Sequence, residues 1–135
     1  MTARLDDHPN AKTRVATRRE GVERLLDLSA FLPAGDRALV EQVFRRGASA
    51  VELGKLGGDP PRRVRYRLRR ILRRVRHPLF NFAAGHMDLI PHRSRPAVRL
   101  VIFHGLSLRH VARRRGEGLH VIRRQIRAVH ELAQL

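Results

Sequence analysis

The amino-acid sequence predicts an all-α protein made of two similar helical units in tandem. Three observations lead to this prediction. Apolar residues recur at intervals of three and four along most of the chain, which is the period of helices with one buried face. The chain is similar to itself when it is shifted by 58 residues, which indicates a repeated structural unit. Hydrophobic residues make up 42% of the sequence and aromatic residues only 4%, so we expect an aliphatic core.

The 135 residues divide into an arm and two units. Residues 1–16 carry mixed charges without a periodic apolar pattern, so we expect a flexible N-terminal arm. Residues 17–78 are expected to form the first unit and residues 79–135 the second, with three or four helices in each.

The first unit begins with two predicted helices. Apolar residues on one face predict a helix over about 18–29, and a leading helix is expected over about 34–46. Gly47 is expected to end the leading helix, and Ser49 is expected to cap the helix that follows.

The segment 47–58 has the features of a helix-turn-helix. Gly54 stands where the two helices would touch and where a side chain would push them apart. Gly58 permits the left-handed backbone of a tight turn. Leu53 and Leu56 are expected to face inward.

The stretch RRVRYRLRRILRRVRHP, residues 62–78, predicts a basic helix over about 60–76. Its apolar residues fall on one stripe, and arginines with one tyrosine cover the rest of the circumference. Asp59 is expected to cap the first turn, and Pro78 to stop the helix after His77. We therefore expect a helix that is buried on one side and cationic on the other.

The second unit repeats these features. Residues 79–90 are apolar enough to pack in the core or between the units, and a leading helix is expected over about 92–104. Caps, turn glycines and the apolar stripe are all kept at the shift of 58 residues. The matched pairs are Pro33 and Pro91, Val40 and Val98, Gly47 and Gly105, Ser49 and Ser107, Gly54 and Ala112, Gly58 and Gly116, Val64 and Ile122, Leu68 and Ile126, Ile71 and Val129, and Val75 and Ala133.

The charge of the chain favours a polyanionic partner. Lys and Arg number 29 against 12 Asp and Glu, which gives a formal net charge of +17. Most of the basic residues are arginine, whose planar guanidinium matches phosphate oxygens and guanine edges at two points. No stretch approaches the ~20 apolar residues of a membrane span, and the N-terminus lacks the apolar segment of a secretory signal. We expect a bacterial protein of the cytoplasm and nucleoid that binds double-stranded DNA.

No catalytic or metal site is predicted. The sequence has no cysteine, so neither a disulfide framework nor a cysteine-based zinc site is available. The eight histidines include no His-x₃-His pair with a nearby acid, and no carboxylate pair or nucleophile constellation stands out. We expect no enzyme activity and no cofactor.

The two basic helices carry the predicted DNA contacts. The outward residues of each N-terminal half are expected to meet base edges in a major groove, and the flanking arginines to meet phosphates. Arg67 and Arg74 are expected among the phosphate contacts. The main predicted contacts are Arg62, Arg63, Arg65, Tyr66, Arg69, Arg70 and Arg73 in the first helix and His120, Arg123, Arg124 and Arg127 in the second.

Short motifs of the first unit match a known family. The patterns E-x-G-K, R-[IV]-R and L-R-[KR]-[LV]-R-H-P are present at residues 52–55, 63–65 and 72–78. Over about residues 31–78 the chain therefore resembles region 4 of bacterial sigma factors, the domain that reads an upstream promoter element. Residues 89–135 share the outline of that region but not its last motif.

The resemblance implies a DNA-reading helix and a second partner. The base-reading positions of the family fall on Pro61, Arg62, Arg65 and Tyr66. Region 4 also binds the flap of the RNA polymerase β subunit, so RNA polymerase is a further expected partner. The promoter-melting region 2 is missing, so we expect no promoter opening by this chain alone.

We predict a sequence-specific transcription regulator that uses both units on a bipartite DNA site, as a monomer or weak dimer. The basic helix of the second unit has fewer arginines at its start, so that unit is alternatively a protein-binding one. Two other functions stay open. One is a sigma-like accessory factor that binds polymerase as well as promoter DNA, and the other is a basic nucleoid-associated protein.

Overall fold

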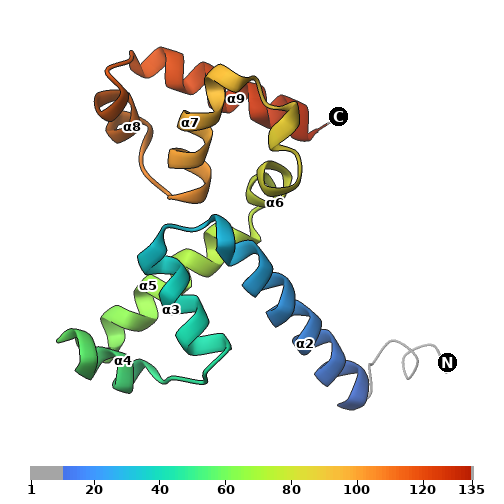
Figure 1. Ribbon diagram of the computed structural model, residues 1–135, viewed down its shortest axis with the longest axis vertical. Helices are drawn as coiled ribbons and strands as arrows, with labels where there is room; N and C mark the ends of the chain where they lie inside the picture. Colours follow the sequence, from blue (N-terminus) through green and yellow to red (C-terminus); the bar gives the residue numbers. More distant parts are fainter. Residues whose placement is uncertain (1–10, 135) are drawn as a thin grey trace, which may run out of the picture.

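The computed structural model describes residues 11–134, which form an all-α fold without a β-strand in that range (Figure 1). The first half contains α2 (Ala11–Leu28), the 3-10 turn η1 (Ser29–Phe31), α3 (Ala34–Phe44), α4 (Ala50–Gly57) and α5 (Pro61–Arg76). The second half contains α6 (Pro78–Gly85), the 3-10 turns η2 (Met87–Leu89) and η3 (His92–Ser94), α7 (Arg95–Val98), the π-helical turn η4 (Arg99–Phe103), α8 (Leu108–Arg115) and α9 (Leu119–Ala133).

The helix α2 begins earlier than the sequence analysis places it. It starts at Ala11, within the segment assigned to the arm, because the residues before position 18 include alanines and basic residues with good helix propensity. Leu25 and Leu28, near its C-terminal end, are buried in the core. The remainder of the predicted arm, residues 1–10, lies outside the described residues.

A serine cap and a left-handed glycine form the corner between α4 and α5. The Ser49 hydroxyl accepts a hydrogen bond from the Glu52 N–H at 3.1 Å, and the Glu52 carboxylate accepts one from the Ser49 N–H at 3.4 Å. This reciprocal pair satisfies two backbone donors that the start of a helix leaves without partners. At the other end of α4, Gly58 has a φ of 72°, a conformation that residues with a Cβ adopt only at a cost.

The corner between α8 and α9 has the same construction. Ser107 accepts a hydrogen bond from the His110 N–H at 3.1 Å, and Gly116 has a φ of 64°. Gly47 and Gly105 share φ values of 70° and 71° in the loops that precede the two corners. The starts of α8 and α9 follow those of α4 and α5 by 58 residues, so the local backbone recurs with the period of the sequence repeat.

The two corners differ in how closely their helices approach. Gly54 of α4 is buried, and a Cβ there would collide with the backbone carbonyl oxygen of Asp59. Ala112 occupies the matched position of α8 and carries its Cβ with only 6% of the residue exposed. The α4–α5 corner is therefore restricted to glycine at this position, whereas the α8–α9 corner is not.

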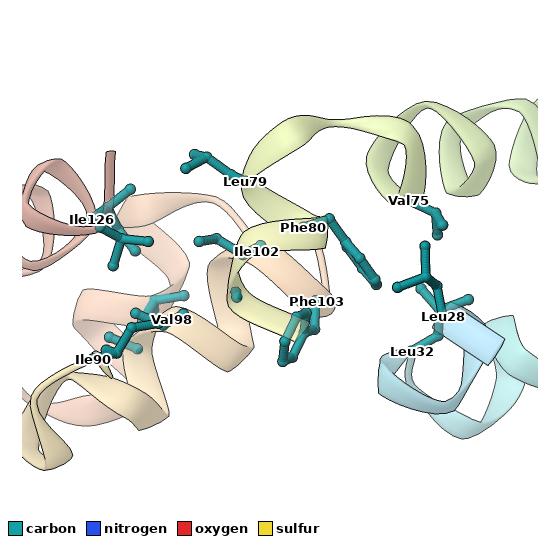
Figure 2. Close-up of a cluster of buried hydrophobic side chains, with 14 of the residues drawn as sticks. Leu28, Leu32, Val75, Leu79, Phe80, Ile90, Val98, Ile102, Phe103 and Ile126 are labelled. Atoms are coloured by element: carbon teal, nitrogen blue, oxygen red, sulfur yellow. The ribbon is translucent and has the colours of Figure 1, made fainter. Parts of the chain in front are cut away.

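One apolar core runs through both halves of the molecule (Figure 2). Phe80 of α6 is fully buried, and its ring meets that of Phe103 edge-on with centroids 5.0 Å apart. Figure 2 shows Phe80 pointing from α6 toward Val75 and Leu28 of the first half. The segment 79–90 thus packs between the halves as expected, although Leu89 is 56% exposed.

A polar bridge crosses between the halves beside this core. Arg74 of α5 donates hydrogen bonds to Asp36 Oδ2 of α3 at 2.7 Å and to the carbonyl oxygen of His104 at 2.9 Å. Arg67 donates to Asp36 Oδ1 at 3.0 Å. The Arg74 and Asp36 side chains are only 20% and 17% exposed, so water screens this pair less than it screens a surface ion pair.

Several side chains differ from the sequence-based expectations. Leu56 is 86% exposed, because the short helix α4 contacts α5 through the side that carries Gly54. Ala133, expected on the buried stripe, is exposed at the end of α9. Asp59 does not cap α5, because Pro60 occupies the cap position, and the Asp59 carboxylate instead accepts a bond from Arg63 at 3.2 Å.

Two helix boundaries also differ. α3 ends at Phe44, two residues before the expected end, and Gly47 stops the helix as expected, because its left-handed backbone (φ 70°) lets the Ala48 N–H bond to the Gln42 carbonyl oxygen at 2.9 Å. The expected leading helix over 92–104 consists of a 3-10 turn, one α-helical turn and a π-helical turn in succession. Pro96 lacks an N–H and restricts the backbone at this point, so that the α-helical part starts only at Arg95.

We expect Gly58→Ala to destabilise the protein by about 1–2 kcal/mol, because alanine is strained in the left-handed region. No atom lies within 4 Å of the added Cβ, so the effect isolates the backbone conformation. The measurement is thermal unfolding followed by far-ultraviolet circular dichroism, with a decrease in Tm of roughly 2–8 °C for each kcal/mol.

Gly57→Ala is the matched control. Gly57 belongs to α4 and has no left-handed backbone, and its Cβ would lie at an ordinary distance of 3.7 Å from Asp59 Oδ2. The control is expected to be neutral or to stabilise by up to about 1 kcal/mol. A decrease in Tm of equal size for both variants would contradict the role assigned to the Gly58 turn.

Candidate nucleic-acid interface

Positive charge is concentrated in the later part of the chain. Residues 1–60 contain 10 Lys and Arg against 9 Asp and Glu, whereas residues 61–135 contain 19 arginines against 3 acids. These counts make up the 29 basic and 12 acidic residues of the whole sequence. Nearly all of the net charge of +17 therefore lies from α5 onward.

The helix α5 presents an exposed cationic stripe opposite its buried face. Val64, Ile71 and Val75 are 9%, 2% and 2% exposed and hold the helix on the core. Residues 62, 66, 69 and 73 follow one another at intervals of four, three and four, so they share the opposite face. The seven predicted contacts on this helix are all exposed: Arg62, Arg63, Arg65, Tyr66, Arg69, Arg70 and Arg73.

Most guanidinium groups of this stripe have no acidic partner among the described residues. Of the seven side chains, only Arg63 takes part in an ion pair in the described part of the chain, with Asp59 at 3.2 Å on a largely exposed surface. Arg70 lies over the Tyr66 ring, 5.9 Å from its centroid. Within residues 11–134 the stripe therefore offers an anionic partner several cations that no acid neutralises.

Arg67 and Arg74, both expected to meet phosphates, face a side of α5 other than the stripe and bond to Asp36. The expectation is wrong for Arg74, because its guanidinium bonds to Asp36 and His104 and its side chain is 20% exposed. Arg67 is 55% exposed but shares the Asp36 carboxylate. Helix phase places both residues on the flank that packs toward α3, which the sequence pattern did not reveal.

The helix α9 carries a matched but shorter stripe. Ile122, Ile126 and Val129 are buried, and His120, Arg123, Arg124 and Arg127 are all exposed. These four residues follow Arg62, Arg65, Tyr66 and Arg69 of α5 by 58 positions each. Glu131 then stands at the position that corresponds to Arg73, so the cationic stripe of α9 ends earlier.

Two basic residues of α8 belong to the same surface and were missed by the sequence analysis. Arg109 and Arg113 are exposed and, with Gly116 and Leu119, line a shallow hollow of about 680 Å³ where α8 meets α9. The matched positions of α4 are Val51 and Lys55, so charge absent from α9 is present on α8 instead. A residue-by-residue comparison of the two repeats would have revealed Arg109 and Arg113.

The two corners lie toward the same side of the molecule. In the view of Figure 1, α5 starts at α4 and α9 starts at α8, both at the left, and both helices run toward the right. From bottom to top the order is α4, α5, α8 and α9, so the N-terminal ends of both cationic helices lie at the left of this view.

Other kinds of site find little support in the described residues. No three potential metal ligands gather within residues 11–134. None of the helices in that range combines the length and the apolar character that a bilayer crossing requires. An apolar hollow of about 560 Å³ lies where α2, α3 and α5 meet, and Leu25, Leu28, Phe44 and Val75 are among the residues that line it.

Comparisons of this chain with protein-family models, with curated proteins and with solved structures found no match.

His104 makes the stability of the junction dependent on pH. Burial, followed by the charges of Arg74 and Arg114, lowers the pKa of His104 below its ordinary value of 6.5, and Asp36 opposes this shift. The folded state thus favours the neutral imidazole, and the unfolded chain binds the proton more readily. The stability that this residue contributes is fully present above pH 6.5 and decreases as the pH falls below that value.

We expect His104→Gln to weaken the decrease in Tm between pH 7.5 and pH 5.5 relative to the unaltered protein. The remaining histidines are common to both proteins, so the difference between the two Tm profiles isolates position 104. Parallel profiles, or a steeper one for the variant, would show that the proton on His104 is not disfavoured by folding.

Proposed function

We propose that this chain is a sequence-specific, DNA-binding transcription regulator with two helix-turn-helix units. The observation that carries the proposal is the pair of exposed, arginine-rich stripes on α5 and α9, whose residues correspond at the repeat distance of 58. Each stripe follows a corner with a serine cap and a left-handed glycine. Binding to double-stranded DNA is consistent with a nucleoid location and with a monomer or weak dimer.

The geometry of the corners supports groove binding by α5 and α9. In a helix-turn-helix, the second helix enters the major groove with its N-terminal residues toward the base edges, while the first helix crosses the backbone. The exposed residues in the N-terminal half of α5 include Arg62, Arg65 and Tyr66, and those of α9 include His120 and Arg123. These side chains would face the base edges in such a complex. Arginine binds guanine O6 and N7 at two points, which gives it a means of base selection.

The distribution of charge supports phosphate binding around the grooves. Arg73 continues the α5 stripe toward the end of the helix, Arg70 lies beside it, and Arg109 and Arg113 extend the surface on α8. If six to ten phosphates are neutralised, the affinity for DNA is expected to fall by about 10³–10⁵-fold from 50 to 200 mM salt. Asp59 is the one acid in the first corner that pairs with a predicted contact, and this pair is exposed.

The exposed apolar residues of α4 favour a second candidate function, a sigma-like accessory factor that also binds RNA polymerase. Leu56 is 86% exposed and Val51 is 46% exposed, so α4 presents two apolar side chains that no described residue covers fully. Co-purification with polymerase that survives nuclease treatment and is lost in Leu56→Ser supports this function.

A basic nucleoid-associated protein is the third candidate. Equal affinity for all duplexes at physiological salt supports it instead.

Selection of bound duplexes from a random pool tests the leading proposal. We expect one bipartite motif to be enriched. On the selected duplex, Arg65→Ala/Arg69→Ala is expected to lower the affinity by about 10²-fold, since each base or phosphate contact contributes roughly 1–3 kcal/mol. The measurement is the Kd by fluorescence anisotropy at several salt concentrations.

Arg18→Ala/Arg19→Ala is the charge-matched control. Both residues are exposed on α2, in the part of the chain with little net charge, and the control removes the same two cations. We expect only a few-fold change for it. Equal losses for the α5 variant and the control would show that net charge alone drives binding, and the proposed base-reading role of α5 would fail.

A further inference from the structure

The two cationic corners are parts of a single packed body. The core cluster includes Leu28, Leu32 and Val75 from the first half and Phe80 and Phe103 from the second. Phe103 contacts Phe80 at 5.0 Å and Phe31 of η1 at 5.1 Å between ring centroids, so its ring touches both halves. Separation of the halves would expose these aromatic rings to water, which the hydrophobic effect opposes.

The connection between the corners is short and is itself packed. α5 ends at Arg76, and α6 begins at Pro78 after the single residue His77. α6 contacts α5, α9 and η4, so it is held by elements of both halves. A chain in this position has no freedom to act as a flexible tether.

The polar bridge adds directional restraint to the apolar contact. The guanidinium of Arg74 reaches Asp36 on one side and the His104 carbonyl oxygen on the other, at 2.7 and 2.9 Å. A Cβ at Gly105 would collide with the Arg74 side chain, so the loop after η4 lies directly against α5. Sliding or rotation of one half relative to the other would break these hydrogen bonds.

We propose that the two corners engage one DNA duplex at a single fixed spacing and with a single relative polarity of the half-sites. This inference rests on the proposed function and specifies which arrangement of DNA half-sites the cationic surfaces of α5 and α9 would bind. The fixed spacing follows from the shared core and the Arg74 bridge. The single polarity follows from the same contacts, because two corners held in one arrangement present their helices in one relative direction.

The helical geometry of DNA turns this rigidity into specificity. Each inserted base pair moves one half-site along the axis by ~3.4 Å and rotates it by about 35°. A flexibly tethered pair of domains tolerates such changes, because the second domain keeps a high effective concentration near its site. A rigid pair loses the second contact altogether when the geometry forbids simultaneous engagement.

The test uses the unaltered protein and duplexes built from the selected bipartite motif. The series carries insertions of 1, 2, 5 and 10 base pairs between the half-sites, one duplex with a single half-site inverted, and each half-site alone. We expect the affinity to fall to the level of a single half-site, about 10²-fold or more, at 5 and at 10 base pairs and on inversion. Recovery at 10 base pairs, where the two sites share a face again, would show a tether that stretches and would overturn the inference.

Matched variants separate this inference from the proposed function. Arg123→Ala/Arg127→Ala removes the α9 contacts that correspond to Arg65 and Arg69, so its affinity is expected to be equally weak at every spacing. Selection of a single half-site, or capture of two separate duplexes by one chain, would overturn the fixed-spacing inference while DNA binding stands. Absence of any preference for the selected duplex over random DNA would reject the proposed function itself.

Discussion

Packing of Phe103 against Phe31 of the first half and Phe80 of the second joins the two halves of the chain into one core, and the arrangement of the cationic surface depends on these contacts. The net charge is carried almost entirely by residues 61–135, so the second half and α5 repel each other electrostatically. Apolar burial between α5, α6 and η4 opposes that repulsion. Asp36 opposes it as well, because one carboxylate accepts hydrogen bonds from both Arg67 and Arg74 where α5 meets the second half.

The two repeats keep the same backbone but distribute their charge differently. Positions that the backbone constrains are kept, as at Gly58 and Gly116, or at the caps Ser49 and Ser107. Surface positions differ, so that α5 carries more arginines than α9, and α8 carries arginines where α4 has Val51 and Lys55. Two corners with one geometry and different side chains suit a partner whose two contact regions are alike in shape and different in sequence.

The uneven charge of the molecule also favours one direction of approach to a polyanion. α2 carries Glu20, Glu23 and Asp27 among its basic residues, whereas α5 carries no acid at all. A field that is strong on one side and weak on another orients a charged partner before contact, and this steering decreases as salt is added.

The sequence by itself determined the helical class, the repeat distance and the exposed stripes, because these follow from local periodicity, capping and the backbone freedom of glycine. Val64, Ile71 and Ile122 are buried as their spacing predicts, and Ser49 and Ser107 cap their helices. Only the tertiary structure decided that Arg74 is part of an internal bridge, that Leu56 is exposed and that Phe103 touches both halves. The Arg74–His104 hydrogen bond joins residues 30 positions apart and the Phe31–Phe103 contact joins the two halves, and no local pattern encodes such distant contacts.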